Sequence, residues 1–266
     1  MSGDEEGGIA VIDSGAGGLP YLSACRRHLA ASRFIYFADT KHYPYGEKSA
    51  DQIIDHVTIV VERLIKEYSP TAFVVACNTA SVVALESLRQ RFSTPFVGVV
   101  PAVKKAAEVS TNRRIGLLAT NRTVLDRYTD ELILQFAEEC HVERVSDEEI
   151  VNFVEHQILE SDVESRMRAI ESAVSRFVST SIDTLVLGCT HFVFVANEFR
   201  SRMPDLRVVD SREGVARQLA RVAPDSHAHL RSSAMPGVLH VSQAGSHEER
   251  YRGFADRFAL TYEGQL

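Results

Sequence analysis

Two short aliphatic runs, each ending on a cysteine, constrain the fold of this chain more than any other feature. The first is Phe73 to Ala76 before Cys77, and the second is Leu185 to Gly188 before Cys189. Continuous apolar runs are typical of buried parallel strands, and open α/β sheets bind ligands at the carboxyl ends of their strands. Each thiol is therefore predicted at a strand end that faces a ligand site.

The rest of the chain alternates strand-like runs with stretches of helical spacing. Further strands are expected at Ile9–Ile12, Arg33–Ala38, Pro95–Val100, Arg114–Ala119, His141–Val145, Leu206–Val209, Gly237–Ser242 and Ala259–Tyr262. Helices are expected at Leu19–Ala31, Ser49–Ile65, Val82–Phe92, Val124–Ala137, Ser146–Glu160, Asp162–Ser179, Phe192–Met203, Gly214–Val222 and Glu248–Phe258. This alternation predicts α/β architecture with mainly parallel sheets. Because the pattern restarts at Arg114, we expect two similar domains around one shared cleft.

Composition excludes several classes of protein. The 266 residues are 45% hydrophobic, which is enough for one large core or two modest ones. The net charge of −7, with lysines and arginines scattered along the chain, gives no electrostatic footprint for nucleic acid. No apolar run approaches the ~20 residues that span a bilayer, and the acidic start does not resemble a signal peptide. We therefore expect a cytoplasmic protein with neither nucleic-acid nor membrane partners, with polar segments at Met1–Gly8 and Asp225–Pro236 outside its folded body.

The four cysteines show no pattern of metal ligands. Cys25, Cys77, Cys140 and Cys189 include no CxxC pair and no short Cys/His spacing, so no metal site is expected. Cys25 falls inside a helical pattern and Cys140 near a helix end, where free cysteine usually behaves as an inert apolar residue. The matched settings of the other two thiols favour chemistry instead.

A glycine-rich turn follows the first strand. Gly15-x-Gly17 and an aspartate at the end of the next strand, Asp39, match part of a dinucleotide-binding fingerprint. However, Pro20 stands where the third glycine belongs, and the carboxylate of Asp13 would repel a pyrophosphate. A nucleotide cofactor is therefore disfavoured, although a carboxylate or phosphate group could lie at the start of the following helix.

A loop with two tyrosines, Asp39 to Lys48, follows the second strand and contains Tyr43-Pro44-Tyr45-Gly46. Aromatic loops at the carboxyl end of a sheet often cover a ligand, and an ordinary turn is the alternative.

Two thiols at matched strand ends suit inversion at a carbon that bears an acidic hydrogen. One thiolate removes the proton from one face, and a thiol on the opposite face returns one. A thiol suits both roles because its unperturbed pKa, about 8.5, lies near neutrality. An α-hydrogen is only weakly acidic, so fixed donors must stabilise the developing charge; Asn78, Thr79 and Thr190 could do so. The sequence gives no signal for pyridoxal phosphate, and no cofactor is expected.

Four motifs together resemble the aspartate/glutamate racemase family and occur in the family's order between about Ile9 and Ala220. They are Asp13-Ser14-Gly15, Pro44-Tyr45-Gly46-Glu47-Lys48-Ser49, Ala76-Cys77-Asn78-Thr79-Ala80 and Leu187-Gly188-Cys189-Thr190-His191. The resemblance implies cofactor-independent interconversion of L- and D-glutamate, which supplies D-glutamate for bacterial peptidoglycan and thus for cell-wall biogenesis and cell shape. It also implies two domains, residues 1–103 with 213–266 and residues 104–212, and a homodimer.

The resemblance also implies roles for particular residues. Cys77 and Cys189 would be the two acid/base groups, assisted by Asp13 and His191, and Glu155 matches an auxiliary carboxylate of the family. Substrate would be held by Asp13, Ser14, Tyr45, Gly46, Asn78, Thr79, Thr120, Thr123, Thr190 and His191. The chain departs from the family pattern at Cys140 to Ile150, at Phe192-Val193-Phe194 and at Arg212, which affects the expected local packing.

Three other functions remain open at this point. They are a related racemase acting on aspartate or another small acid, a thiol hydrolase, and a non-catalytic amino-acid binder. The histidine after Thr190 favours glutamate within the family. A hydrolase needs one reactive cysteine and a binder needs none, whereas this chain has two in matched positions.

Overall fold

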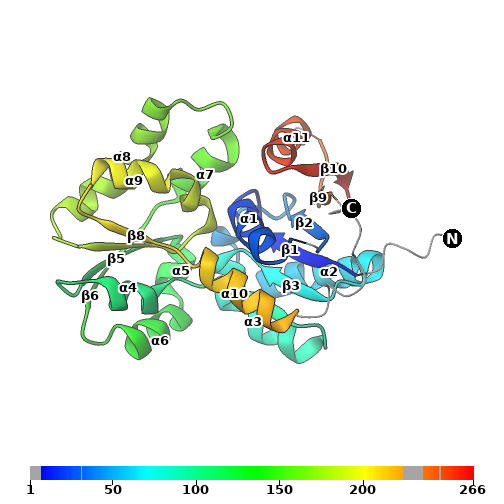
Figure 1. Cartoon of the computed structure of the whole chain (residues 1–266), viewed down its shortest axis with the longest axis horizontal. Coiled ribbons are helices and arrows are strands. Elements are labelled where there is room, and N and C mark those ends of the chain that lie inside the picture. The colour runs from blue at the N-terminus through cyan, green and yellow to red at the C-terminus, as the bar shows by residue number, and fades with distance from the viewer. Residues whose placement is uncertain (1–6, 31, 224–235, 246) are drawn as a thin grey trace. The chain divides into compact units, whose positions relative to one another are not determined.

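The computed structural model describes residues 7–30, 32–223, 236–245 and 247–266. These residues form two compact units, which we call the first unit (Met1–Val99 with Arg212–Leu266) and the second unit (Val100–Ser211). Figure 1 labels the elements of both. The predicted polar segments at the start of the chain and at Asp225–Pro236 fall almost wholly outside the described residues.

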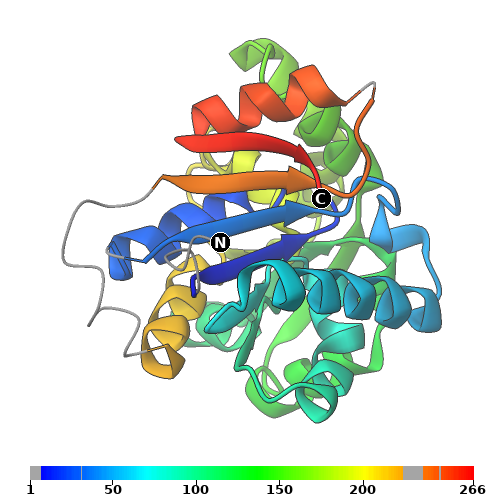
Figure 2. The same cartoon turned by 90° about the vertical axis from the view of Figure 1, so that its right-hand side faces the viewer.

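The first unit is built on a six-stranded sheet in the order β10-β9-β2-β1-β3-β4, and all of its strand pairs are parallel. Its strands are β1 (Ile9–Asp13), β2 (Phe34–Ala38), β3 (Ala72–Val75), β4 (Phe96–Gly98), β9 (Gly237–Val241) and β10 (Leu260–Gln265). β1, β2 and β3 are buried along their whole length, which explains their continuous apolar sequences. Figure 2 shows β9, orange, lying beside β2, and β10, red, on the other side of β9.

The described residues of the first unit form five helices and one short 3₁₀ turn. They are α1 (Leu19–His28), η1 (Tyr45–Glu47), α2 (Ala50–Tyr68), α3 (Asn78–Arg91), α10 (Arg212–Val222) and α11 (Glu248–Arg257). α2 begins with a capping box, in which Ser49 and Gln52 exchange hydrogen bonds between side chain and backbone. The helix then buries Ile53, Val57 and Leu64 in the core, as their spacing predicts.

The second unit contains a four-stranded parallel sheet in the order β6-β5-β7-β8. Its strands are β5 (Arg114–Ala119), β6 (His141–Ser146), β7 (Thr184–Leu187) and β8 (Arg207–Val209). Its helices are α4 (Val103–Val109), α5 (Asn121–Leu125), α6 (Arg127–Phe136), α7 (Glu148–Gln157), α8 (Val163–Val178), the 3₁₀ helix η2 (Thr190–Val195) and α9 (Ala196–Arg202). The prediction of α/β architecture with parallel sheets is confirmed.

The two sheets share a strand order. In the first unit, β2-β1-β3-β4 follow one another across the sheet, and β6-β5-β7-β8 follow the same pattern in the second. Cys77 follows β3 and Cys189 follows β7, so the two thiols occupy equivalent places in equivalent sheets. The restart of the pattern at Arg114 therefore corresponds to a repeated topology.

Several helix predictions were wrong in detail. The helix expected at Val82 begins four residues earlier, because buried polar residues at its start hide its apolar spacing. The helix expected over Val124–Ala137 is two helices, because Asp126 is extended and caps α6 through the backbone N–H of Tyr128. The stretch after Cys189 starts as a 3₁₀ helix, and α4 was not predicted at all.

Two further sequence expectations concern burial and membranes. Cys25 lies fully buried in α1, and burial raises the pKa of its thiol to about 12, so it stays protonated at neutral pH. Of the helices in the described ranges, none is both long enough and apolar enough to cross a membrane.

Candidate active site

In the first unit, the ends of β1 and β3 bring Ser14 to Cys77. The strands are adjacent and parallel, with Ile12 opposite Val75, so the residues that follow them emerge at one edge of the sheet. Ser14 Oγ lies 4.0 Å from Cys77 Sγ, and only 8% of Cys77 is exposed. Hydroxyl and thiol thus form a close, nearly buried pair.

The glycine-rich turn is held by its own hydrogen bonds. Asp13 is fully buried and accepts from the backbone N–H of Gly15 at 3.0 Å and from Ser14 Oγ at 3.3 Å. The hydroxyl of Tyr36 accepts from the N–H of Gly18 at 3.1 Å and donates to the carbonyl of Gly15 at 2.7 Å. Both of these N–H groups are satisfied within the protein.

Asn78 and Thr79 begin α3 directly after Cys77, and each is only 2% exposed. Neither Oδ1 nor Nδ2 of Asn78 has a hydrogen-bond partner in the described part of the protein. A buried amide without partners costs about 1–3 kcal/mol, so such groups usually have a functional explanation. An amide offers both a donor and an acceptor, which suits a ligand that carries a carboxylate and an ammonium group.

Tyr45 is the buried residue of the two-tyrosine loop. Its hydroxyl donates to Asp39 Oδ2 at 2.6 Å, and it packs in the same apolar cluster as Cys77. Burial, followed by the negative charge of Asp39, raises the pKa of Tyr45 well above its usual value; Cys77 and Asp13 act in the same direction. Gly46 lies beside Tyr45 in η1 and is half-buried. The loop is therefore packed against the Cys77 region.

Asp39 is a site residue that the sequence interpretation did not assign. It is fully buried at the end of β2 and also lies 2.9 Å, through Oδ2, from Nδ1 of His42. The available signal was an acidic residue at the carboxyl end of a buried strand, which we had considered only as part of a nucleotide fingerprint.

In the second unit, Cys189, His191 and Glu155 form a chain of contacts. Nδ1 of His191 lies 3.8 Å from Cys189 Sγ, and Nε2 lies 3.1 Å from Oε2 of Glu155. Cys189 and His191 follow β7, whereas Glu155 lies in α7. Tertiary packing therefore brings Glu155 to residues that are 34 and 36 positions further along the chain. All three are buried, with 6%, 2% and 2% exposed, respectively.

His191 carries a raised pKa despite its burial. Desolvation is the largest single influence and lowers the pKa, but the hydrogen bonds to Cys189 and Glu155, together with their charges, outweigh it. The net direction is well above the usual value, which favours the protonated imidazole. It presents a proton to the sulfur of Cys189.

Thr120 and Thr123 lie at the end of β5, the strand next to β7. Thr120 caps α5, since its Oγ1 accepts from the backbone N–H of Thr123 at 3.4 Å, and it donates to Oγ1 of Thr123 at 3.1 Å. Both are buried, as is Thr190 directly after Cys189. The hydroxyl groups of the second unit thus gather at the sheet edge that carries its thiol.

Each unit therefore places one cysteine among buried polar groups at the carboxyl edge of its sheet. That both thiols face the same substrate stays a prediction. Within the described ranges, no group of three His, Cys, Asp or Glu side chains is placed to hold a metal ion.

Comparison with known proteins gives one consistent result. The family model for Asp/Glu/Hydantoin racemase matches residues 9–219. The glutamate racemase of Treponema pallidum (strain Nichols) is 38% identical over 258 residues, covering 97% of this chain and 96% of that protein. The glutamate racemase of Glaesserella parasuis serovar 5 is 39% identical over 219 residues, covering 82% of this chain and 81% of that protein. The crystal structure of Escherichia coli glutamate racemase with L-glutamate and the activator UDP-MurNAc-Ala is 34% identical, with a TM-score of 0.88 and 98% of both chains covered.

Proposed function

The chain belongs to the Asp/Glu/Hydantoin racemase family, and from this premise we propose that it interconverts L-glutamate and D-glutamate without a cofactor. Relatives that share more than a third of its sequence over most of its length are glutamate racemases. The observation that carries the proposal is the equivalent position of the two thiols. Cys77 follows β3 and Cys189 follows β7, and each of these strands is the third in chain order in the sheet of its unit.

The mechanism we propose uses the two thiols as a pair. One thiolate removes the α-proton, so that an S–H bond forms as the C–H bond breaks and the electron pair passes into the substrate carboxylate. The thiol on the other face then gives its proton to the same carbon. The result is inversion without oxidation or reduction, and the roles of Cys77 and Cys189 exchange when the reaction runs backwards.

His191 and Glu155 would serve the Cys189 side. A protonated imidazole beside the sulfur stabilises the thiolate when Cys189 acts as a base and keeps a proton close when it acts as an acid. Glu155 holds that imidazole in its charged form. On the Cys77 side, Ser14 Oγ lies 4.0 Å from the sulfur and donates to Asp13, and we assign Asp13 and Ser14 the corresponding supporting role.

Substrate binding would use the buried donors and acceptors around each thiol. The unpartnered amide of Asn78 is the best placed to take the polar groups of an amino acid. Thr79, Thr190 and His191, with Tyr45 and Gly46 of the loop, complete the proposed set, and Thr120 and Thr123 are further contacts. Fixed donors in a site that excludes water stabilise the developing carboxylate charge without reorganisation.

The cellular role follows from the proposed reaction. D-glutamate made in the cytoplasm would enter peptidoglycan, and the enzyme would thereby support cell-wall biogenesis and cell shape. We also propose that the chain works as a homodimer with two domains, residues 1–103 with 213–266 and residues 104–212.

A thiol hydrolase is the second candidate, because Cys189, His191 and Glu155 resemble a nucleophile, a base and an orienting acid. One experiment separates the two functions. The protein is incubated with L-glutamate in deuterated water without added cofactor, and circular dichroism and α-deuteration are followed. A racemase loses the optical signal while deuterium enters the α-position, and the Cys77→Ser variant keeps its optical signal. Unchanged glutamate in the wild-type sample, or release of an acyl product from ester or amide substrates, contradicts the proposal.

A further inference from the structure

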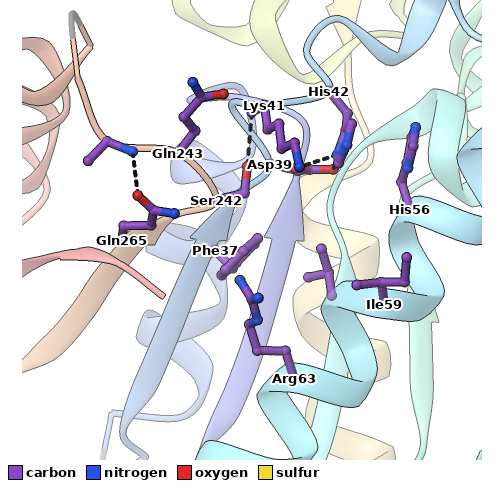
Figure 3. Close-up of a pocket in the computed structure, with 12 residues that line it drawn as sticks. Phe37, Asp39, Lys41, His42, His56, Ile59, Arg63, Ser242, Gln243 and Gln265 are labelled. Carbon is purple, nitrogen blue, oxygen red and sulfur yellow. Dashed lines mark hydrogen bonds and ion pairs between the residues drawn. The ribbon is translucent and has the colours of Figure 1, made fainter.

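A pocket of about 540 Å³ lies in the first unit, apart from the proposed glutamate contacts. The loop after β2, one face of α2 and the ends of β9 and β10 form its walls, as Figure 3 shows. Neither Cys77 nor any residue assigned above to substrate lines it. Its volume is in the range of sites for small organic ligands.

Two cationic side chains, Lys41 and Arg63, line this pocket and have N–H groups that could bind a ligand. The backbone N–H of Lys41 donates to Ser242 Oγ at 2.9 Å, which fixes the loop, whereas its ammonium group has no partner in the described part of the chain. Arg63, on α2, donates through Nη1 to the backbone oxygen of Leu266, the last residue of the sequence. Its other guanidinium N–H groups have no partner among the described residues.

The acidic lining does not offset these charges. Asp39 is the acidic residue of the pocket wall, and its carboxylate already accepts from Tyr45 Oη at 2.6 Å and contacts His42 Nδ1 at 2.9 Å. Of the two cations in the lining, the ammonium group of Lys41 is paired with no acidic side chain in the described part of the chain. Such a lining attracts an anion.

The rest of the lining mixes apolar side chains with histidines and with polar residues of the C-terminal strands. Phe37 lies at the base and is fully buried, whereas Ile59 is 57% exposed although it lines the pocket. The rings of His42 and His56 are stacked, with their centroids 3.6 Å apart and their planes 8° from parallel. An apolar group in the pocket would cover exposed surface of Ile59, which is favourable by roughly 25 cal/mol per Å² of apolar area removed from water.

We propose that this pocket binds an organic anion whose carboxylate or phosphate group pairs with Lys41 and Arg63 and whose apolar body packs on Ile59. This site lies outside the glutamate site and does not depend on the proposed racemization. Carboxylates and phosphate monoesters share the chemistry that the two cations recognise, so the test includes one of each.

The test uses three small probes and the full-length protein. Binding of 3-phenylpropionate, phenyl phosphate and uncharged benzyl alcohol is measured by saturation-transfer difference NMR. We expect at least one anion to bind at least tenfold more tightly than benzyl alcohol, and the preferred anion identifies the acid group. Equal affinity for the alcohol and both anions, or no binding of either anion, overturns the proposal.

Single substitutions test whether the anion binds in this pocket. Lys41→Gln removes a charge that makes no hydrogen bond and should weaken anion binding at least fivefold, and Ile59→Glu should weaken it further by adding a like charge on an exposed position. Arg200→Gln is the matched control, because this exposed arginine of α9 bonds to Asn197, lies outside the pocket lining, and its loss changes the net charge equally. Racemization and thermal unfolding should be unchanged in Lys41→Gln. Anion binding that survives either pocket substitution, or that falls equally in Arg200→Gln, overturns the assignment.

Discussion

Nε2 of His191 lies 3.1 Å from Oε2 of Glu155, and both side chains are almost completely buried. A buried histidine is ordinarily neutral, because desolvation disfavours its charged form. Here the hydrogen bonds and charges of Cys189 and Glu155 raise the pKa of His191 and favour the protonated imidazole. The pair is therefore an arrangement for holding a proton next to Cys189.

Glu155→Gln should lower kcat and change its dependence on pH. Without the carboxylate, the pKa of His191 falls, so the imidazole loses its proton at a lower pH and the alkaline limb of the kcat profile moves to lower pH. General acid–base support is typically worth about 10²–10⁴-fold, and an indirect contribution through His191 should cost about 10–100-fold. The profile is measured in both directions of racemization. Glu164→Gln, at an exposed position paired with Arg168, is the control and should leave it unchanged.

Cys77→Ser and Cys189→Ser should each abolish racemization while leaving glutamate binding detectable. A hydroxyl is far less acidic than a thiol, so neither variant can supply a base at neutral pH on the affected face. The loss should be at least about 10³-fold, measured by circular dichroism, with glutamate binding followed by calorimetry. Cys140→Ser lies outside both candidate groups and should retain full activity. Normal turnover in either active-site variant would exclude the two-thiol mechanism.

Gly18→Ala should destabilise the protein and impair the Cys77 side of the site. A Cβ atom at Gly18 would lie 2.6 Å from the Cβ of Ala76, the residue before Cys77, and 3.1 Å from Oδ2 of Asp13. Neither neighbour can move without shifting a buried strand end, so we expect a loss of about 1–3 kcal/mol in the free energy of unfolding.

The control for that substitution is Gly214→Ala. Gly214 lies in α10, where an added Cβ would meet nothing within 4 Å. Since alanine is the better helix former, this variant should be more stable by roughly 0.5–1 kcal/mol. Urea unfolding measures both variants. If the two substitutions changed the free energy of unfolding equally, the close contact between a Cβ at position 18 and Ala76 would not be destabilising.

Asp183, in the second unit, should make the free energy of unfolding depend on pH. Burial alone would raise the pKa of its carboxyl, but hydrogen bonds from Ser110, Thr111 and Asn112 lower it well below the usual value. Because the folded-state pKa is depressed, this stabilisation is fully present above the unfolded-state pKa, near 3.9, and is lost as the pH falls toward the folded-state value.

Asp183→Asn should therefore cost about 1–3 kcal/mol at pH 7 and progressively less as the pH falls below about 4. Urea unfolding at pH 7 and pH 3 gives the difference. Asp205→Asn, at an exposed position, should change little at either pH. A cost that is the same at both pH values would mean that the charge of Asp183 does not stabilise the fold.

The sequence predicts the strands of this fold well because buried parallel strands are apolar along their whole length. β1, β3 and β7 all appear as continuous aliphatic runs, and both thiols lie where those runs end. The start of α3 was missed for the opposite reason. Asn78 and Thr79 are polar but buried, so they interrupt the apolar spacing that identifies a helix.

Contacts between distant elements could not be predicted from spacing. The bond between Tyr45 and Asp39 depends on how the loop folds back over the end of β2. The contact of Glu155 with His191 depends on the packing of α7 against η2. Family resemblance supplied Glu155, whereas nothing in the pattern of the chain indicated Asp39 as a partner of Tyr45.

Asn78→Leu should separate substrate binding from stability. Leucine has nearly the same shape as asparagine, and it would replace an amide whose Oδ1 and Nδ2 have no hydrogen-bond partner in the described structure. Removing an unsatisfied buried group relieves a cost of about 1–3 kcal/mol, so the variant should be as stable as the wild type or more stable. If the amide holds glutamate, KM should rise at least tenfold. Asn112→Leu is the matched contrast, because its side chain is bonded to Ser181 and Arg114 and the substitution should lower stability without changing KM. An Asn78→Leu variant that unfolds more easily and binds glutamate normally would make Asn78 a structural residue.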